Sequence, residues 1–149
     1  MQIVPEFTFH VGVGEGFRIG GGPFGDRMVG VVDGGWVRGE RIAGQVVGPG
    51  ADWAVKGADG FAHIDVRAQV RTDDGANIYL HYTGSLDMNE AITTALSGDG
   101  ETQFGDAYWA VHVRLESGAA QYRWVNRTIL VGEGRVATDG VEYEISRVV

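Results

Sequence analysis

His81 and Tyr79 lie two residues apart in a segment that alternates polar and apolar side chains. Residues two apart on a β-strand face the same side of a sheet, so this spacing places an imidazole beside a phenol hydroxyl. Histidine changes its protonation state near neutral pH, and a neighbouring carboxylate can orient its ring. His81 and Tyr79 are therefore candidates for general acid–base catalysis. The alternative is a histidine with an ordinary surface or core role.

Asp65 and Arg67 show the same spacing in the preceding alternating segment, residues 62–71. An Asp-Gly turn at residues 74–75 joins the two segments, and this pattern predicts a β-hairpin. A tight turn places Asp65 and Arg67 across from His81 on one face of the hairpin. Asp65 would then orient the imidazole, and Arg67 would stabilise negative charge on a substrate. The alternative is a purely structural ion pair between Asp65 and Arg67.

The polar face of this hairpin is either solvated exterior or the wall of a site, and we expect it to line a cavity. An orientation toward bulk solvent would instead make the hairpin scaffold, and the interpretation of these residues as an active site would fail with it. Tyr108 adds a further hydroxyl, and the tryptophans offer flat apolar walls for an aromatic ligand. The predicted catalytic residues are His81, Tyr79, Tyr108 and Asp65, and the predicted substrate-binding residues are Arg27, Arg67, Trp53, Trp124 and Asn126.

Other site chemistries find less support in the sequence. His63, Asp65 and His81 could converge as metal ligands, but their spacing does not demand it, so we predict no metal and no organic cofactor. The glycines at 12–16 and 20–23 lack the Gly-Lys-Ser/Thr and the helical pattern of a phosphate-binding loop. The absence of cysteine excludes disulfides, thiolate metal sites and thiol nucleophiles.

Charge and length narrow the class of protein further. The 149 residues include 20 acidic and 12 basic side chains, for a net charge of −8, which disfavours binding to nucleic acid. The chain contains neither an apolar run of membrane-spanning length nor a signal-peptide pattern at its start. We therefore expect a cytoplasmic protein with no membrane partner.

Short alternating runs separated by glycines recur along the chain and predict about eight to ten strands, including one at 121–131. So many short strands favour an all-β fold, a single antiparallel barrel of the lipocalin or calycin type spanning residues 1–149. An exposed barrel edge would allow a homo-oligomer. Residues 88–97 break the pattern and predict one short helix capped by Asp87, either a plug on the barrel or a lid over its mouth.

A set of motifs along nearly the whole chain resembles the DUF3237 family, also called UPF0311. The most specific are Gly-Ala-Asp-Trp, Asp-x-Arg and Thr-Asp-Asp-Gly-Ala in combination. The segments that carry the resemblance are 25–27, 34–35, 50–53, 59–60, 65–67, 72–79, 122–127 and 131–135. The resemblance implies a calycin-like β-barrel and names no activity. Members commonly read Tyr-Phe-Arg where this chain has Tyr108-Trp109-Ala110, so an anion-binding role of that arginine does not carry over.

From these residues we expect a small cofactor-independent enzyme, a lyase, dehydratase or isomerase that works by general acid–base catalysis. Its substrate would be a small aromatic or polyketide-like molecule held in the barrel. One alternative is a non-catalytic binder of small hydrophobic ligands. Another is a subunit-interaction domain without a ligand.

Overall fold

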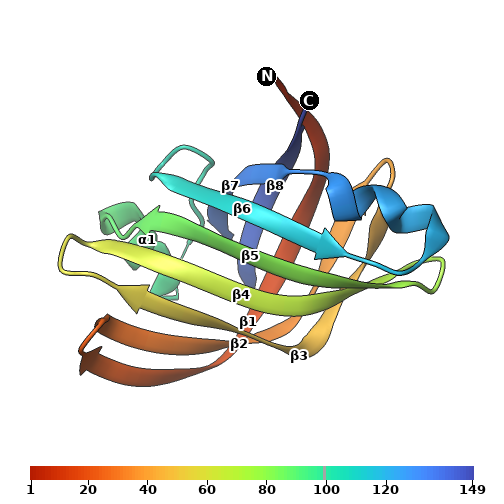
Figure 1. Ribbon diagram of the computed structural model, residues 1–149. Helices are drawn as coiled ribbons and strands as arrows, with labels where there is room; N and C mark the ends of the chain where they lie inside the picture. The colour runs from red at the N-terminus through yellow and green to blue at the C-terminus, as the bar shows by residue number, and fades with distance from the viewer. Residues whose placement is uncertain (99) are drawn as a thin grey trace.

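The computed structural model describes residues 1–98 and 100–149, and its eight antiparallel strands form a closed barrel (Figure 1). Each strand pairs with its neighbours in sequence, and β1 also pairs with β8 to close the ring. This confirms the predicted all-β antiparallel barrel. The strands are β1 (Ile3–Gly22), β2 (Gly25–Gly39), β3 (Ala43–Lys56), β4 (Phe61–Thr72), β5 (Asn77–Asp87), β6 (Trp109–Glu116), β7 (Leu130–Ala137) and β8 (Gly140–Val148).

The hairpin of β4 and β5 forms as its alternation predicts. Val66 lies opposite Tyr82 in the ladder and both are buried, while the residues between such positions face outward. The turn is closed by Thr72, whose hydroxyl accepts from the Ala76 N–H at 2.8 Å. Gly75 adopts a positive φ of 90° there, which glycine tolerates at no steric cost.

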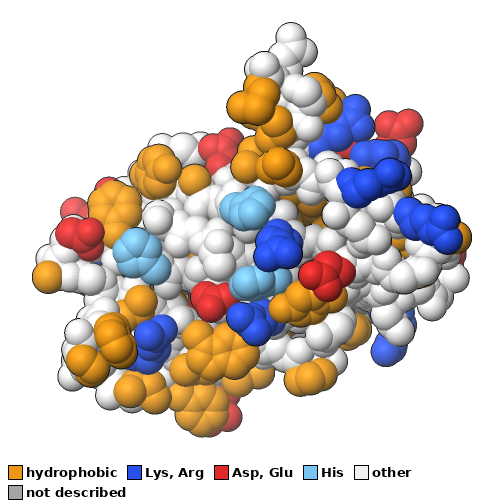
Figure 2. All heavy atoms as spheres, viewed as in Figure 1, with side chains coloured by type: hydrophobic (Ala, Val, Ile, Leu, Met, Phe, Trp, Pro, Cys, Tyr) orange, Lys and Arg blue, Asp and Glu red, His pale blue; other side chains and the backbone are white. Residues whose placement is uncertain are grey.

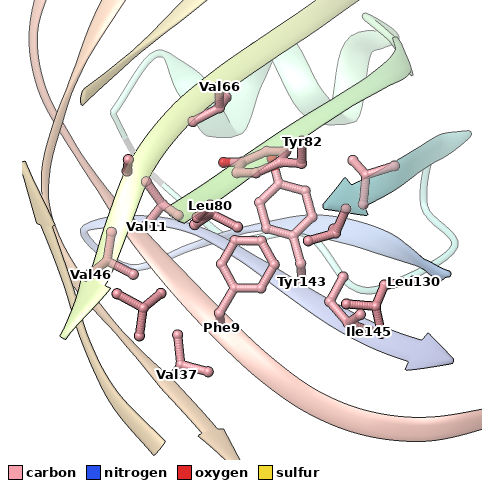
Figure 3. Packing of buried hydrophobic residues seen from close by; sticks show 14 of the residues in the cluster. Phe9, Val11, Val37, Val46, Val66, Leu80, Tyr82, Leu130, Tyr143 and Ile145 are labelled. Carbon is pink, nitrogen blue, oxygen red and sulfur yellow. The ribbon is translucent and has the colours of Figure 1, made fainter. Parts of the chain in front are cut away.

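Hydrophobic side chains fill the interior of the barrel, and the aromatic rings among them come from strands that are distant in sequence (Figure 3). The ring of Tyr143 on β8 stacks on Phe9 of β1 at 4.8 Å between centroids and meets Tyr82 of β5 edge-on at 5.0 Å. Trp109 of β6 contacts the same tyrosine in a T-shaped arrangement. The centre of the barrel is thus a packed hydrophobic core.

The first three strands are longer than their sequence patterns suggest. The sequence predicts strands at 3–11, 28–32 and 51–55, whereas β1, β2 and β3 continue through the glycine-rich segments between them. Shifts of register accompany these glycines, for example between Val13 and Gly16. Such irregularities bend a strand without ending it, so glycines that read as turns are bulges.

The sequence predicts one strand over residues 121–131, and the first part of this prediction is wrong. A 3-10 helix, η1 (Ala120–Arg127), precedes β7. Tyr122 and Val125 are its buried residues, and their three-residue spacing matches the three residues per turn of a 3-10 helix. The alternating polarity of the segment resembles that of a strand, but burial at this spacing favours the helix.

The predicted helix forms as α1 (Glu90–Leu96), with Asn89 rather than Asp87 as its N-terminal cap. The Asn89 side chain accepts from the Ile92 N–H at 3.1 Å. Ile92 and Ala95 are buried with the core residues of the barrel, so α1 packs as a plug. Neither helical segment of the described residues is long enough to cross a membrane.

Candidate active site on the outer face

His81 and Asp65 form the predicted pair on neighbouring strands. The imidazole Nε2 lies 2.8 Å from the Asp65 Oδ1. The His81 side chain is 21% exposed and that of Asp65 is 44% exposed, so the pair is shielded but reachable from solvent. Tyr79 lies beside it, with its ring 6.3 Å from the imidazole and inclined by only 27°. The tight turn fixes the register of the β4–β5 hairpin, and this register brings His81, Asp65 and Tyr79 together.

Two arginines flank His81 on the neighbouring strands. Arg67 of β4 lies directly opposite His81, and Arg114 of β6 lies opposite it on the other side. Directly opposite residues have Cβ atoms about 5 Å apart. The closest acidic partner of Arg114 is Glu116 at 4.0 Å, and both side chains are exposed. The imidazole therefore sits between two cations, which suits an anionic group of a ligand.

This cluster lies on the outer surface of the barrel, and the prediction that it lines an internal cavity is wrong. By the expectation stated above, the hairpin is scaffold for the interior and the active site predicted inside the barrel fails with it, so any site here is one on the outer face. Ile64, Val66 and Ala68 alternate with Asp65 and Arg67 along β4 and are the residues that face the core. Figure 2 shows histidine, arginine and acidic side chains gathered on the exposed face of β4, β5 and β6. The interior is occupied by the buried hydrophobic side chains of the core, with Phe9, Tyr82 and Tyr143 among them.

An apolar row of exposed side chains adjoins the polar cluster. Phe17 lies opposite Val29, and Val29 lies opposite Trp53. Asp52 pairs with Val66, so the next residue, Trp53, comes level with Asp65 on the outer face. Phe17 is 47% exposed and Trp53 is 43% exposed. Trp53 thus offers a flat apolar surface next to the His81–Asp65 pair, as its predicted role in substrate binding requires.

A groove of about 730 Å³ opens on the other side of Tyr79. Its lining includes Gln69, Asn77, Tyr79, Glu116, Ser117 and Asn126. Asn126 uses its side-chain amide to hold the chain after β6, since its Oδ1 accepts from the Ser117 N–H and its Nδ2 donates to the Ser117 carbonyl. Asn126 therefore shapes the groove wall, and its predicted contact with substrate stays a prediction.

Two other predicted residues, Tyr108 and Trp124, do not join the cluster around His81. Tyr108 is 63% exposed, and its ring contacts that of Phe61. The Tyr108 carbonyl accepts a hydrogen bond from the Asp87 N–H, which places Tyr108 at the end of β5 away from His81. Trp124 belongs to η1 and lies under the guanidinium of Arg41, 3.8 Å from its ring centroid. The structure therefore does not place Tyr108 or Trp124 beside the imidazole.

Arg27 also has a structural partner. Its Nη1 donates to the Trp53 carbonyl at 2.8 Å, so the guanidinium braces the strand that carries Trp53.

The metal site considered for His63, Asp65 and His81 is not assembled. Across residues 1–98 and 100–149, no three histidine, aspartate or glutamate side chains form a group that could hold a metal ion.

Asp52 is the residue near this site that the sequence reasoning missed. Its Oδ1 accepts a hydrogen bond from the backbone N–H of Asp65 at 3.1 Å. Burial raises the pKa of the Asp52 carboxyl to about 6, and the nearby charge of Asp65 adds to the rise. The Gly-Ala-Asp-Trp motif that contains Asp52 was a signal, but its spacing does not reveal this contact.

Comparisons with known proteins agree with the fold and give little about activity. The family model described as "Protein of unknown function (DUF3237)" matches residues 1–148. A UPF0311 protein of Rhodopseudomonas palustris is 26% identical over 142 residues, which cover 95% of this chain and 93% of that protein. None of these descriptions states a reaction.

Solved structures share the barrel over almost the full length of the chain. A β-barrel-like protein of Acinetobacter baumannii is 27% identical with a TM-score of 0.83, covering 98% of this chain and 94% of the other. A conserved protein of unknown function from Rhodopseudomonas palustris is 25% identical with a TM-score of 0.89, covering 99% and 97%. A protein of Penicillium herquei described as an enzyme is 20% identical with a TM-score of 0.68, covering 97% and 93%, and shows the same fold.

Proposed function

Because the chain belongs to the DUF3237 family, whose activity is unknown, we propose a function from the site itself: a small enzyme in which His81, paired with Asp65, performs general acid–base catalysis. The substrate is a small aromatic or polyketide-like molecule bound on the outer face of the barrel. The reaction is a proton transfer of the lyase, dehydratase or isomerase type, without a metal or organic cofactor. The observation that carries the proposal is the 2.8 Å contact between His81 Nε2 and Asp65 Oδ1.

The pairing with Asp65 decides which nitrogen of His81 can act on a substrate. An ionised carboxylate only accepts hydrogen bonds, so Nε2 carries the proton that is donated to Asp65. Nδ1 then holds the lone pair and is the atom that takes a proton from the substrate. Among the described residues no protein group is hydrogen-bonded to this nitrogen, which keeps it open to a ligand.

The surroundings of His81 supply the other parts of such a site. Arg67 and Arg114 stabilise negative charge that develops when a carbon or hydroxyl of the substrate loses its proton. The exposed ring of Trp53 binds the flat apolar part of the molecule. The Penicillium herquei enzyme has the same fold, which supports catalysis on a barrel of this kind.

The exposed apolar row also supports a second function, a non-catalytic binder of small hydrophobic ligands. Phe17, Val29 and Trp53 would bind such a molecule without any proton transfer. The two functions differ in whether the bound molecule exchanges a proton with His81.

Deuterium incorporation next to the carbonyl of a panel of small aryl ketones, followed by NMR in D₂O, tests the proposal. Wild-type protein should catalyse exchange in at least one member. His81→Gln should lower that rate by about 10²-fold or more, a usual size for the loss of a general base. His10→Gln is the matched control, because His10 also contacts a carboxylate, Glu142 at 3.4 Å, but lies on β1.

Equal exchange rates in wild type and His81→Gln would refute the proposed role of His81. Quenching of tryptophan fluorescence by these ketones without any exchange would support the binder instead. In that case Trp53→Leu should abolish the quenching, because its ring is the one beside the site.

A further inference from the structure

We infer that Asp52 is a positioning residue for the His81–Asp65 pair: its side chain holds the backbone of Asp65 and thereby sets how Asp65 meets the imidazole. Its consequence for catalysis rests on the proposed function, whereas the contact itself does not. Asp52 lies on β3 and touches neither His81 nor the outer face where a substrate would bind.

The ladder between β3 and β4 skips two pairs at this position while its register stays the same. Asp52 pairs with Val66, and the pairing then resumes with Val55 opposite His63. In the interval the N–H of Asp65 donates to the Asp52 Oδ1. A side chain therefore takes a bonding position that a strand carbonyl fills elsewhere in a sheet.

Arg27 completes the arrangement from the other neighbouring strand. The carbonyl of Trp53 accepts from the Arg27 guanidinium at 2.8 Å. Two side chains from β2 and β3 thus satisfy backbone groups that lie directly beside the His81–Asp65 pair. Both backbone groups are thus hydrogen-bonded by side chains at the point where the ladder skips its pairs.

Asp52 faces the buried side of the sheet, where its charge is costly. Gly30 lies opposite it on β2 and Val66 on β4, and neither offers a charge. The titratable groups that sense it are Asp65 on β4, Tyr82 on β5 and Tyr143 on β8. Its charge contributes to the raised pKa values of both tyrosines, whose main cause is burial. Burial likewise raises the pKa of Asp52 to about 6.

A carboxyl group with this pKa ionises within the physiological range, which a backbone carbonyl cannot do. Hydrogen bonds to an ionised acceptor are about twice as strong as those between neutral groups. As the pH rises through about 6, the hold of Asp52 on the Asp65 N–H strengthens. The geometry of the His81–Asp65 pair then depends on whether the Asp52 carboxyl, on the buried side of the sheet, is protonated.

NMR of ¹⁵N-labelled protein tests this inference without a substrate. The Asp65 amide resonance should move downfield with a midpoint near pH 6 in wild type, because its acceptor becomes charged. Asp52→Asn should abolish that transition. His81→Gln should retain it, which separates titration of Asp52 from titration of the imidazole. A transition that survives in Asp52→Asn, or disappears in His81→Gln, would overturn the inference.

The imidazole nitrogens of His81 provide a second readout. Asp52→Ala removes the acceptor and should lower the fraction of His81 with its proton on Nε2. Asp52→Asn retains an acceptor oxygen and should restore that fraction. If Asp52→Ala does not fold, the amide titration of Asp52→Asn alone decides. Glu101→Gln is the matched control, because its carboxylate also accepts from a backbone N–H, that of Thr138 at 3.0 Å, next to β7 and β8.

Turnover then separates this inference from the proposed function. With an active ketone in hand, Asp52→Ala should lower kcat about tenfold with KM unchanged, because substrate contacts remain. Altered NMR signals with unchanged turnover in His81→Gln would refute the proposed function and leave the positioning role standing. A loss of turnover in His81→Gln together with identical NMR signals in wild type and the Asp52 variants would support the proposed function and refute the positioning role of Asp52.

Discussion

The carboxylate of Asp52 accepts a hydrogen bond from the backbone N–H of Asp65 at 3.1 Å, although the two side chains belong to opposite faces of the sheet. A β-sheet is a single layer of backbone. A side chain on its buried face, such as Asp52, can therefore accept a hydrogen bond from the backbone N–H of a residue whose own side chain lies on the outer face, such as Asp65. The packed interior of the barrel is therefore connected to the site around His81 by this hydrogen bond.

The raised pKa of Asp52 predicts an unusual dependence of stability on pH. The folded pKa of about 6 lies above the unfolded value of about 3.9. The folded state binds this proton more tightly, so the stabilisation is fully present below pH 4 and is lost as the pH rises through 6. Two units correspond to about 3 kcal/mol. Asp52→Asn cannot ionise and should be more stable than wild type at pH 8 by about 1 to 3 kcal/mol.

Urea unfolding at pH 4.5 and pH 8 measures this difference. The Asp52→Asn variant should lose less stability than wild type between the two values. Glu101→Gln serves as a control of opposite sign, because hydrogen bonds from Thr138 lower the pKa of Glu101 and its ionised form favours folding above pH 4. A variant Asp52→Asn that is less stable than wild type at pH 8 would contradict the prediction.

The buried hydroxyl of Thr72 should stabilise the turn between β4 and β5. Thr72 is 3% exposed, and its hydroxyl accepts from the Ala76 N–H while donating to Asp74. Thr72→Ala leaves the amide without its partner and should cost about 1 to 3 kcal/mol of unfolding free energy. Thr72→Ser keeps the hydroxyl and should recover most of the loss. Hydrogen exchange of the Ala76 amide should accelerate in Thr72→Ala and not in Thr72→Ser.

The sequence predicts the β4–β5 hairpin and the pairing of His81 with Asp65 because a tight turn fixes the register. It misses which face is the interior. Alternation shows that two faces differ, but whether the barrel is hollow depends on aromatic side chains that meet only in the closed ring. Phe9, Tyr82 and Tyr143 come from three distant strands, and their combined volume leaves a packed core.

Asp52 escapes sequence reasoning for a different reason. Its partner is a backbone N–H at an opening in the ladder, and a pattern of side chains does not show where a ladder opens. The segment 120–127 escapes because Tyr122, Trp124 and Asn126 alternate as a strand would, whereas contact with the core selects the spacing of Tyr122 and Val125. Local patterns therefore predict local pairing here, and closure of the barrel determines the rest.

The helix α1 should behave as a plug and not as a mobile lid. Ile92 is 1% exposed and belongs to the main core cluster. Ile92→Ala should therefore lower the free energy of unfolding by about 2 to 5 kcal/mol, as for other large-to-small core changes. Leu96→Ala is the control on the same helix, because Leu96 is 49% exposed, and it should change stability by about 0.5 kcal/mol or less. Equal, small effects of the two changes in urea unfolding would favour a lid.

The arginines beside His81 should favour an anionic aromatic ligand over a neutral one. Benzoate and benzyl alcohol are suitable probes, since they share the ring and differ in charge. Calorimetric titration at low salt should show tighter binding of benzoate, and Arg67→Gln should weaken it about tenfold, which is about 1.4 kcal/mol and in the range of an exposed charge-assisted contact. Binding of benzyl alcohol should not change, because Arg67 contributes charge and not apolar surface.

Arg71→Gln is the matched control for this experiment. Arg71 lies on the same outer face of β4, but it is paired with Asn77 near the turn and not with His81. It should leave benzoate binding unchanged. Addition of 0.5 M salt should reduce the difference between wild type and Arg67→Gln, since the screening length falls below about 5 Å. Equal losses in Arg67→Gln and Arg71→Gln would mean that the whole face attracts anions through its general charge, with no site at His81.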